Sequence, residues 1–232
     1  MIPTVETVWD VVKRHDLQLV LFDMDDTLYP EYDYVLSGFS VVGRYMQERY
    51  GISQAFEQLK ELFDRDSARV FNRLMDAHGI SYTDEDVRTW ISLYKNHRPT
   101  LTLDASVADM LSALKENGIR LGVITDGNPV QQQYKFEALG LSRWIEECVI
   151  TDRLGGEQYR KPHPEAFERM ARYFDVPFEK TAYIGDNPKK DFAIRAVYPI
   201  VTVHYQGERH GLYRQEAYRD DIKPCYILSE LK

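Results

Sequence analysis

The stretch LVLFDMDDTLYPE, residues 19–31, sets three aspartates directly behind a short apolar run. The apolar residues are typical of a buried β-strand. Aspartate is a poor strand former, and closely spaced carboxylates repel one another. Asp23, Asp25 and Asp26 therefore need an explanation beyond local structure.

The composition of the chain excludes several classes of protein. With 232 residues, of which 44% are hydrophobic and 28% charged, it fits one sizeable domain or a core domain with a smaller insertion. A net charge of -8 argues against nucleic-acid binding. No apolar run has the length of a signal peptide or a membrane span, so we expect a cytoplasmic protein without a membrane partner. Cys148 and Cys225 lack metal-site spacing and are expected to be buried thiols.

The apolar pattern alternates between strands and helices along most of the chain. Short apolar runs at 17–22, 119–124, 148–150, 181–184 and 200–203 predict buried strands. Between most of them lie amphipathic stretches with apolar positions Val107, Met110, Leu111 and Leu114; Tyr134, Phe136 and Leu139; and Phe167, Met170, Ala171 and Phe174. This alternation predicts an α/β fold, a Rossmann-like parallel sheet with helices on both faces.

Residues 30–100 break this alternation, because they contain no convincing strand. Apolar residues share helical faces at Val35, Phe39, Val42 and Met46; at Phe56, Leu59 and Phe63; and at Val87, Ile91 and Tyr94. Thr83 and Asp86 have the spacing of a capping box. We expect an inserted all-helical domain at 30–100 and a core formed by 1–29 and 101–232, in which the first 16 residues add a helix. The alternative is a long helical crossover that only covers the sheet.

Three predicted strands end in polar motifs: FDMDDT, VITDGNP and YIGDNPKKD. Asn followed by Pro, at 128–129 and at 187–188, predicts a helix start, since Asn is a favoured N-cap and Pro a favoured first helical residue. The carboxyl ends of parallel strands lie on one edge of the sheet, where ligands bind. We therefore expect convergence of Asp23, Asp25, Thr125, Lys161, Asp186 and Asp191.

A cluster of carboxylates would repel an anion unless a cation lies between them. Hard oxygen ligands suit Mg²⁺, which keeps coordination positions for water and a substrate phosphate. Helix N-termini at the same edge would offer free N–H groups to an anion. The acids are thus expected to hold a metal and to act on a phosphate.

These motifs, in this order, resemble the four motifs of the haloacid dehalogenase superfamily of hydrolases. The resemblance covers about residues 19–205, and the insertion lies where that family has its helical cap. It implies a Mg²⁺-dependent phosphatase that hydrolyses a small phosphomonoester, such as a sugar phosphate or a nucleoside monophosphate, through an aspartyl-phosphate. The small phosphorylated metabolite is the expected partner, and the oligomeric state stays open.

The resemblance also implies a role for each motif residue. Asp23 would be the nucleophile, and Asp25 would protonate the leaving oxygen and then activate water. Phosphate would be bound by Thr125, the backbone amide of Asp126 and Lys161. Mg²⁺ would be bound by Asp23, Asp186 and the backbone carbonyl of Asp25. Thr27 would brace the turn, and Asp191 would orient Lys161 or the metal's waters.

Two alternatives remain at this point: transfer of the phosphoryl group to an acceptor other than water, as in a phosphotransferase or mutase, and a non-catalytic module that binds a phosphorylated ligand or a partner protein. Mutases of the superfamily usually carry Gly after the second acid, whereas Asp26 and Thr27 stand here. An intact Asp23 and Asp25 favour an enzyme, because binding alone needs neither a nucleophile nor an acid.

Overall fold

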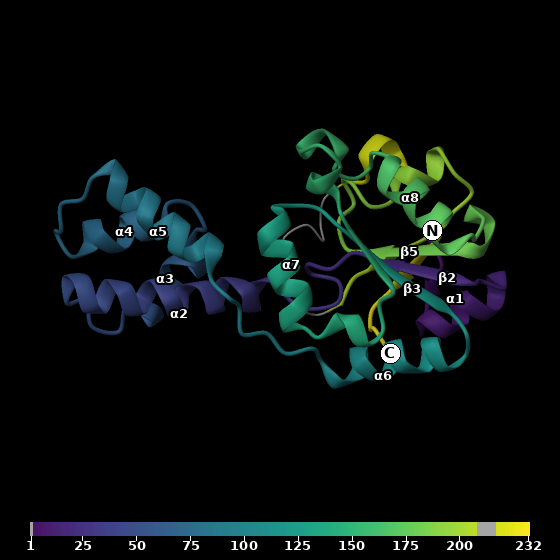
Figure 1. Cartoon of the computed structure of the whole chain (residues 1–232), viewed down its shortest axis with the longest axis horizontal. Coiled ribbons are helices and arrows are strands. Elements are labelled where there is room, and N and C mark those ends of the chain that lie inside the picture. The colour runs from purple at the N-terminus through teal and green to yellow at the C-terminus, as the bar shows by residue number, and fades with distance from the viewer. Residues whose placement is uncertain (1, 208–216) are drawn as a thin grey trace. The chain divides into compact units, whose positions relative to one another are not determined.

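The computed structural model of the chain describes residues 2–207 and 217–232 (Figure 1). The chain divides into two compact units. The core unit consists of Met1–Glu31 and Thr102–Lys232, and the helical unit consists of Tyr32–Leu101.

The core unit is built on one sheet in which all neighbouring strands are parallel. Its seven described strands lie in the order β1-β7-β6-β5-β2-β3-β4. Their bounds are β1 Thr4–Val5, β2 Leu19–Phe22, β3 Arg120–Thr125, β4 Glu147–Ile150, β5 Thr181–Gly185, β6 Val201–Tyr205 and β7 Tyr226–Leu228. The five predicted strands and the α/β fold are confirmed. The two short strands β1 and β7 lie beyond the prediction.

Helices cover both faces of the sheet. Figure 1 shows α8 (Glu165–Phe174) on one face, and α1 (Val8–His15) and α6 (Ala105–Glu116) on the other. Phe167 and Met170 of α8 belong to one buried cluster with Leu19 and Leu21 of β2. Helix α7 (Pro129–Ala138) follows β3, and its N-cap Asn128 accepts hydrogen bonds from two backbone N–H groups, as predicted. Short 3-10 helices occupy Leu141–Arg143, Thr151–Leu154, Glu157–Tyr159, Phe178–Lys180, Ala193–Ala196 and Arg219–Asp221.

Asp26 shapes the turn that follows β2. Its φ of 52° lies in the left-handed region, which Asp tolerates better than most residues. Its Oδ1 accepts a hydrogen bond of 2.9 Å from the N–H of Glu31, the first residue of α2 (Glu31–Tyr50). That N–H has no partner within the helix. The third acid of the opening motif therefore has a structural role.

The helical unit contains the rest of α2 together with α3 (Ala55–Arg65), α4 (Val70–Ala77) and α5 (Asp84–Asn96). All its residues are described, and none forms a strand. The predicted face of α2 is buried: Val35, Phe39, Val42 and Met46 belong to one core cluster. The capping box of α5 is also confirmed, since Thr83 and Asp86 each accept a hydrogen bond from the other's backbone N–H.

The predicted buried face of α5 is wrong by one position. The side chain of Trp90 is fully buried, whereas Ile91 is 39% exposed. The indole ring packs edge-on against Tyr50 and Tyr82, with ring centroids 6.2 and 5.4 Å away. Burying this larger apolar surface outweighs burying the isoleucine.

The predicted helix start at Asn187 is also wrong. The chain there makes a turn that leads into the short 3-10 helix Ala193–Ala196. The N–H of Asn187 donates to Asp191 Oδ2 at 2.8 Å, and the N–H of Lys189 donates to Asn187 Oδ1 at 3.0 Å. The Asn187 carbonyl also accepts from the N–H groups of Lys190 and Asp191, at 3.2 and 3.0 Å, so Asn187 caps a single turn and not a helix.

Cys148 and Cys225 are free thiols, and each is half-buried rather than fully buried as expected. Among the described residues, no helix combines the length and the apolar character that a membrane span requires.

We expect Trp90→Ala to destabilise the helical unit by about 3–5 kcal/mol, because truncation of a buried Trp leaves a large cavity. Ile91→Ala is the matched control and should cost less than about 1 kcal/mol, since that side chain is partly solvated. Urea unfolding measures both changes when it is followed by the circular dichroism of the helical backbone, a signal that does not depend on Trp90. Equal losses in the two variants would contradict the observed register of α5.

Candidate active site

The carboxyl ends of β2, β3 and β5 meet in the middle of the sheet, because β2 pairs with β3 on one side and with β5 on the other. Asp23 follows β2, Thr125 ends β3, and Asp186 follows β5. All three side chains are buried. The chain runs outward from β2 in both directions along the sheet, which is the arrangement that places a ligand-binding crevice at this edge.

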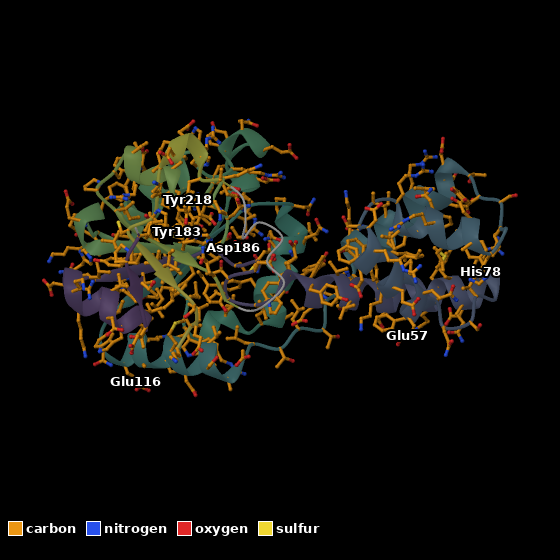
Figure 2. The ribbon with its side chains drawn as sticks, turned by 180° about the vertical axis from the view of Figure 1, so that it is seen from behind. Glu57, His78, Glu116, Tyr183, Asp186 and Tyr218 are labelled. Carbon is orange, nitrogen blue, oxygen red and sulfur yellow. The ribbon has the colours of Figure 1, made fainter. Side chains whose placement is uncertain are left out.

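Lys161, in the loop before α8, connects the buried acids. Its Nζ lies 2.8 Å from Asp23 Oδ1 and 3.0 Å from Asp191 Oδ1, and it donates to the Tyr183 hydroxyl at 2.7 Å. Burial acts to lower the pKa of Lys161, but the carboxylates of Asp191 and Asp23 outweigh it and raise the pKa above its ordinary value. Figure 2 shows Tyr183 and Asp186 in this part of the core unit.

Three carboxylates at this edge could hold a metal ion. Asp23, Asp186 and Asp191 each offer an oxygen within 4.8 Å of the others. Burial, followed by the charges of Asp191 and Asp23, raises the pKa of Asp186 to about 9. Burial also raises the pKa of Asp23 to about 6, although Lys161 acts against it. A divalent cation would offset this repulsion, so the donor set fits Mg²⁺.

Asp191 is the least available of these three acids. Its Oδ1 lies close to Lys161 and accepts from the Tyr183 hydroxyl at 3.2 Å, while its Oδ2 accepts from the N–H of Asn187. Asp23 and Asp186 are therefore the better candidates for direct metal ligands, whereas Asp191 is paired with Lys161.

The carboxylate of Asp25 lies among three donors. Lys135 Nζ is 2.7 Å from Oδ1, the Tyr29 hydroxyl donates to the same oxygen at 2.6 Å, and Gln132 Nε2 donates to Oδ2 at 2.7 Å. Lys135 also lies 3.4 Å from Glu31 Oε1. Burial acts to raise the pKa of Asp25, but the charge of Lys135 and these hydrogen bonds bring the pKa below its ordinary value. Asp25 is thus held in one orientation.

The sequence prediction missed Gln132 and Lys135, and it was right for only one of its three apolar positions in this stretch, Leu139. The helix forms as predicted, and Leu139 at its C-cap is buried, yet the buried residues within the helix are Gln132 and Lys135, while Tyr134 and Phe136 are only half-buried. Two polar residues three positions apart share a helix face, and this was the signal available. Both side chains contact the carboxylate of Asp25. Hydrophobic periodicity does not reveal a buried polar contact of this kind.

The remaining predicted residues have the following surroundings. Thr125 is fully buried, and Gln132 Nε2 donates to its hydroxyl at 2.5 Å. The Asp126 carboxylate accepts from the Thr151 hydroxyl at 2.9 Å and from the N–H of Lys161 at 3.1 Å, which ties the loop of Lys161 to the end of β3. Thr27 is buried, but its hydroxyl has no hydrogen-bond partner among the described residues. Any bracing by Thr27 is therefore through packing.

A cavity of about 450 Å³ opens onto these groups within the core unit. Its walls carry more acidic than basic side chains: Asp23, Asp25, Asp26, Glu31, Asp126 and Asp186 against Arg160, Lys161 and Lys190. A cation in this cavity would find oxygen ligands, and an anion would find the partly exposed side chains of Arg160 and Lys190, so the cavity can hold both together.

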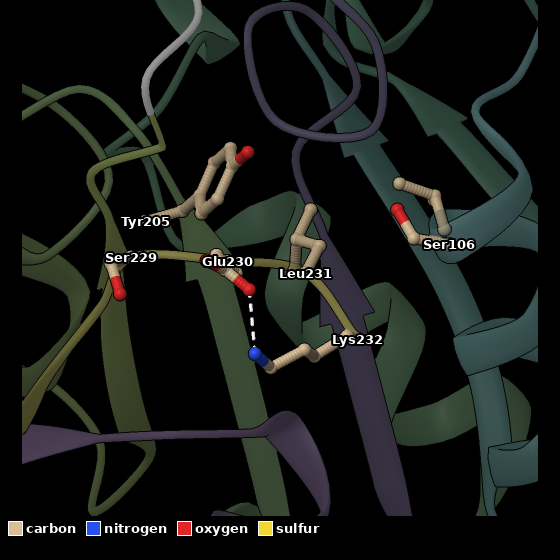
Figure 3. A pocket seen from close by; sticks show the side chains of 7 residues that line it. Ser106, Tyr205, Ser229, Glu230, Leu231 and Lys232 are labelled. Carbon is tan, nitrogen blue, oxygen red and sulfur yellow. Dashed lines mark hydrogen bonds and ion pairs between the residues drawn. The ribbon is translucent and has the colours of Figure 1, made fainter.

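Two other cavities have different walls. One of about 320 Å³ lies between the start of α6 and the C-terminal residues, where Lys232 pairs with Glu230 at 2.6 Å (Figure 3). The other, of about 440 Å³, lies in the helical unit and has aromatic walls that include Phe39, Phe63 and Tyr94. Neither contains a cluster of carboxylates, so the cavity at the strand ends is the candidate active site.

The same four motifs identify the family. A model of the haloacid dehalogenase-like hydrolases matches residues 17–195. The chain belongs to this family. The matched range contains all the site residues described above, from Asp23 to Asp191.

Relatives and solved structures of this family resemble most of the chain. A glyceraldehyde 3-phosphate phosphatase of Methanopyrus kandleri is 29% identical over 88% of this chain and 89% of its own length. One of Pyrococcus furiosus is 28% identical over 93% and 90%. The crystal structure of the hydrolase YfnB from Bacillus subtilis has a TM-score of 0.61 at 18% identity and covers 91% of this chain and 93% of its own, which supports the fold.

We expect Asp186→Asn to stabilise the metal-free protein at alkaline pH. The pKa of Asp186, 3.8 in the absence of perturbation, is about 9 in the folded state, so folding favours the protonated carboxyl. This contribution is full below about pH 4 and is lost as the pH rises towards the folded-state pKa. The difference in melting temperature between variant and wild type, measured with EDTA, should therefore grow from about pH 6 to about pH 9. The exposed Asp109→Asn is the control, and a difference independent of pH would contradict the expectation.

Proposed function

We propose that the chain is a Mg²⁺-dependent phosphatase that hydrolyses a small phosphomonoester through an aspartyl-phosphate. The observation that carries the proposal is the placement of Asp23: its carboxylate is buried, contacts Lys161 at 2.8 Å, and lines a cavity that Asp25 and Asp186 also line. The curated relatives described above, which are named phosphatases, support the same reaction class.

In the first step, an oxygen of Asp23 attacks phosphorus, and the bond from phosphorus to the ester oxygen breaks. A carboxylate needs no base for this attack. The proton that the departing oxygen requires comes from the carboxyl group of Asp25, which must therefore be protonated before this step although the donors around it favour its ionised form. Lys135, Gln132 and Tyr29 fix the position of that group through the contacts described above.

In the second step, water attacks the same phosphorus atom, and Asp25, now ionised, takes a proton from it. The bond from phosphorus to Asp23 breaks, which restores the carboxylate and leaves inorganic phosphate. The donors around Asp25 favour its ionised form, as this step requires.

Asp23, Asp186 and the backbone carbonyl of Asp25 are the proposed ligands of Mg²⁺. When bound, the ion supplies positive charge between these carboxylates and the phosphoryl oxygens. Thr125 and the backbone amide of Asp126 would hold phosphoryl oxygens by hydrogen bonds.

The helical unit is proposed to act as the family's cap and to select the substrate. A cap admits small metabolites and excludes phosphorylated side chains of folded proteins. Triose phosphates are the first compounds to test, since relatives at 28–29% identity are named glyceraldehyde 3-phosphate phosphatases.

Asp23→Asn should abolish turnover of phosphomonoesters, because the amide cannot serve as a carboxylate nucleophile. Rapid quenching with mass spectrometry should detect a phosphorylated Asp23 in the wild type, with Mg²⁺ present, and none in the variant. Asp26→Asn is the matched control: asparagine tolerates the left-handed turn and keeps an oxygen for the Glu31 N–H, so activity should persist. Substantial turnover by Asp23→Asn, or full wild-type activity in excess EDTA, would rule the proposal out.

Lys135→Met should lower kcat/KM more for alkyl phosphates than for p-nitrophenyl phosphate. The nitrophenolate leaves without a proton, whereas an alkoxide depends on a well-placed acid, so we expect a loss on the order of tenfold to a hundredfold for the alkyl ester only. Lys115→Met, the same change at an exposed position of α6, should affect neither ester. Equal losses for both esters would show that Lys135 serves the fold rather than Asp25.

A further inference from the structure

The ammonium group of Lys161 has no donor left for a substrate. A lysine has three N–H groups, and three protein oxygens lie within 3.0 Å of this nitrogen, on Asp23, Asp191 and Tyr183. The side chain is also completely shielded from solvent. A phosphoryl oxygen could bond to Lys161 only by displacing one of these acceptors, and each is an anion or a buried hydroxyl.

Lys190 has donors to spare in the same cavity. Its Nζ lies 3.3 Å from Asp126 Oδ2 and 3.8 Å from Asp23 Oδ2. Only the first of these contacts is short enough for a hydrogen bond. The side chain is 27% exposed, and it lines the cavity that Asp23, Asp25 and Asp186 share.

The position of Lys190 suits the charge that develops during phosphoryl transfer. Negative charge is spread over the equatorial oxygens of the transferring group, and fixed cations beside it stabilise the transition state. A phosphorus atom attacked by Asp23 must lie next to the Asp23 carboxylate. The Lys190 ammonium lies beside the same carboxylate, between it and the carboxylate of Asp126. The Asp126 backbone amide is a proposed ligand of the same phosphoryl group.

Arg160, the third cation of this cavity, is less available. Its guanidinium donates two hydrogen bonds to Asp152, at 2.8 and 2.7 Å, and pairs with Glu157 at 3.2 Å. Arginine binds one carboxylate through two parallel bonds in this way, which fixes its orientation. Lys190 is therefore the best-placed donor for a substrate anion.

We propose that Lys190 contacts the transferring phosphoryl group, and that Lys161 instead positions the nucleophile Asp23. This inference rests on the proposed phosphatase function and changes the role that the motif resemblance assigns to Lys161. Lys190 acts as a charged hydrogen-bond donor throughout and exchanges no proton with the substrate. Its site would accept any phosphoryl or phosphate oxygen.

The test compares Lys190→Met and Lys190→Gln with Lys189→Met, a matched change at the exposed neighbouring lysine. Removal of a donor to the transition state typically costs about a hundredfold to a thousandfold in kcat. We expect a loss of this size in both Lys190 variants with p-nitrophenyl phosphate and Mg²⁺, and a weaker inhibition by inorganic phosphate. Lys190→Arg should recover part of the turnover and part of the inhibition by phosphate, and Lys189→Met should match the wild type in both measurements. Melting temperatures verify that the variants are folded.

A structural role for Lys190 would be to neutralise Asp126, and a double variant separates the two roles. If Lys190 only offsets that carboxylate, Lys190→Met combined with Asp126→Asn should restore activity and phosphate inhibition, which would overturn the inference. If Lys190 contacts the phosphoryl group, the double variant stays defective relative to Asp126→Asn alone, which also reports the loss of the Asp126 contacts with Thr151 and Lys161. Wild-type values in both single variants would also overturn it.

Calorimetric titration with inorganic phosphate distinguishes a failure of this inference from a failure of the proposed function. If the wild type hydrolyses no phosphomonoester but binds phosphate, and Lys190→Met loses this binding, the contact of Lys190 with an anion stands and the phosphatase function is overturned. If the wild type hydrolyses esters, and Lys190→Met has unchanged turnover and phosphate affinity, only the proposed contact of Lys190 is overturned. A wild type with neither activity nor phosphate binding overturns both.

Discussion

Buried negative charge at the carboxyl ends of β2 and β5 is the constraint on which the rest of the site depends. Asp23, Asp186 and Asp191 have oxygens within 4.8 Å of one another. Carboxylates so close cannot all ionise in a poorly solvated place unless cations lie beside them. The fold supplies Lys161 from the loop before α8 and Lys190 from the turn after β5. These loops are therefore tied to the sheet by charge as well as by covalent connection.

The central part of the fold could be predicted because its signal is local. Strands β2, β3 and β5 are continuous apolar runs, and the turns behind them carry polar motifs that can be recognised in order. The strands β1 and β7, at one end of the sheet, have only two and three residues, too few for periodicity to register. Their pairing joins the two ends of the chain, from Thr4 to Ile227, and no local pattern predicts a contact so distant in sequence.

The candidate site divides in the same way. Motif residues could be placed because their motifs follow a strand or, for Lys161, precede a helix, whereas Gln132, Lys135 and Lys190 could not be assigned roles. Gln132 and Lys135 lie on a helix whose buried face was expected to be apolar, and only the position of Asp25 gives them a partner. Lys190 and Lys189 are adjacent in sequence, yet one lines the cavity and the other is exposed.

The turn after β5 is also held by residues from later in the chain. His204, fully buried in β6, has its Nε2 3.0 Å from the carbonyl oxygen of Asp186. A carbonyl only accepts, so Nε2 carries the proton and Nδ1 can accept from the Tyr218 hydroxyl, 3.0 Å away. The N–H of Arg219 donates to the carbonyl of Pro188 at 3.0 Å. These contacts come from residues beyond 195, where the family match ends. The motifs therefore contain the proposed reacting groups, while His204 of β6 and Arg219 contact the turn that carries Asp186 and Lys190.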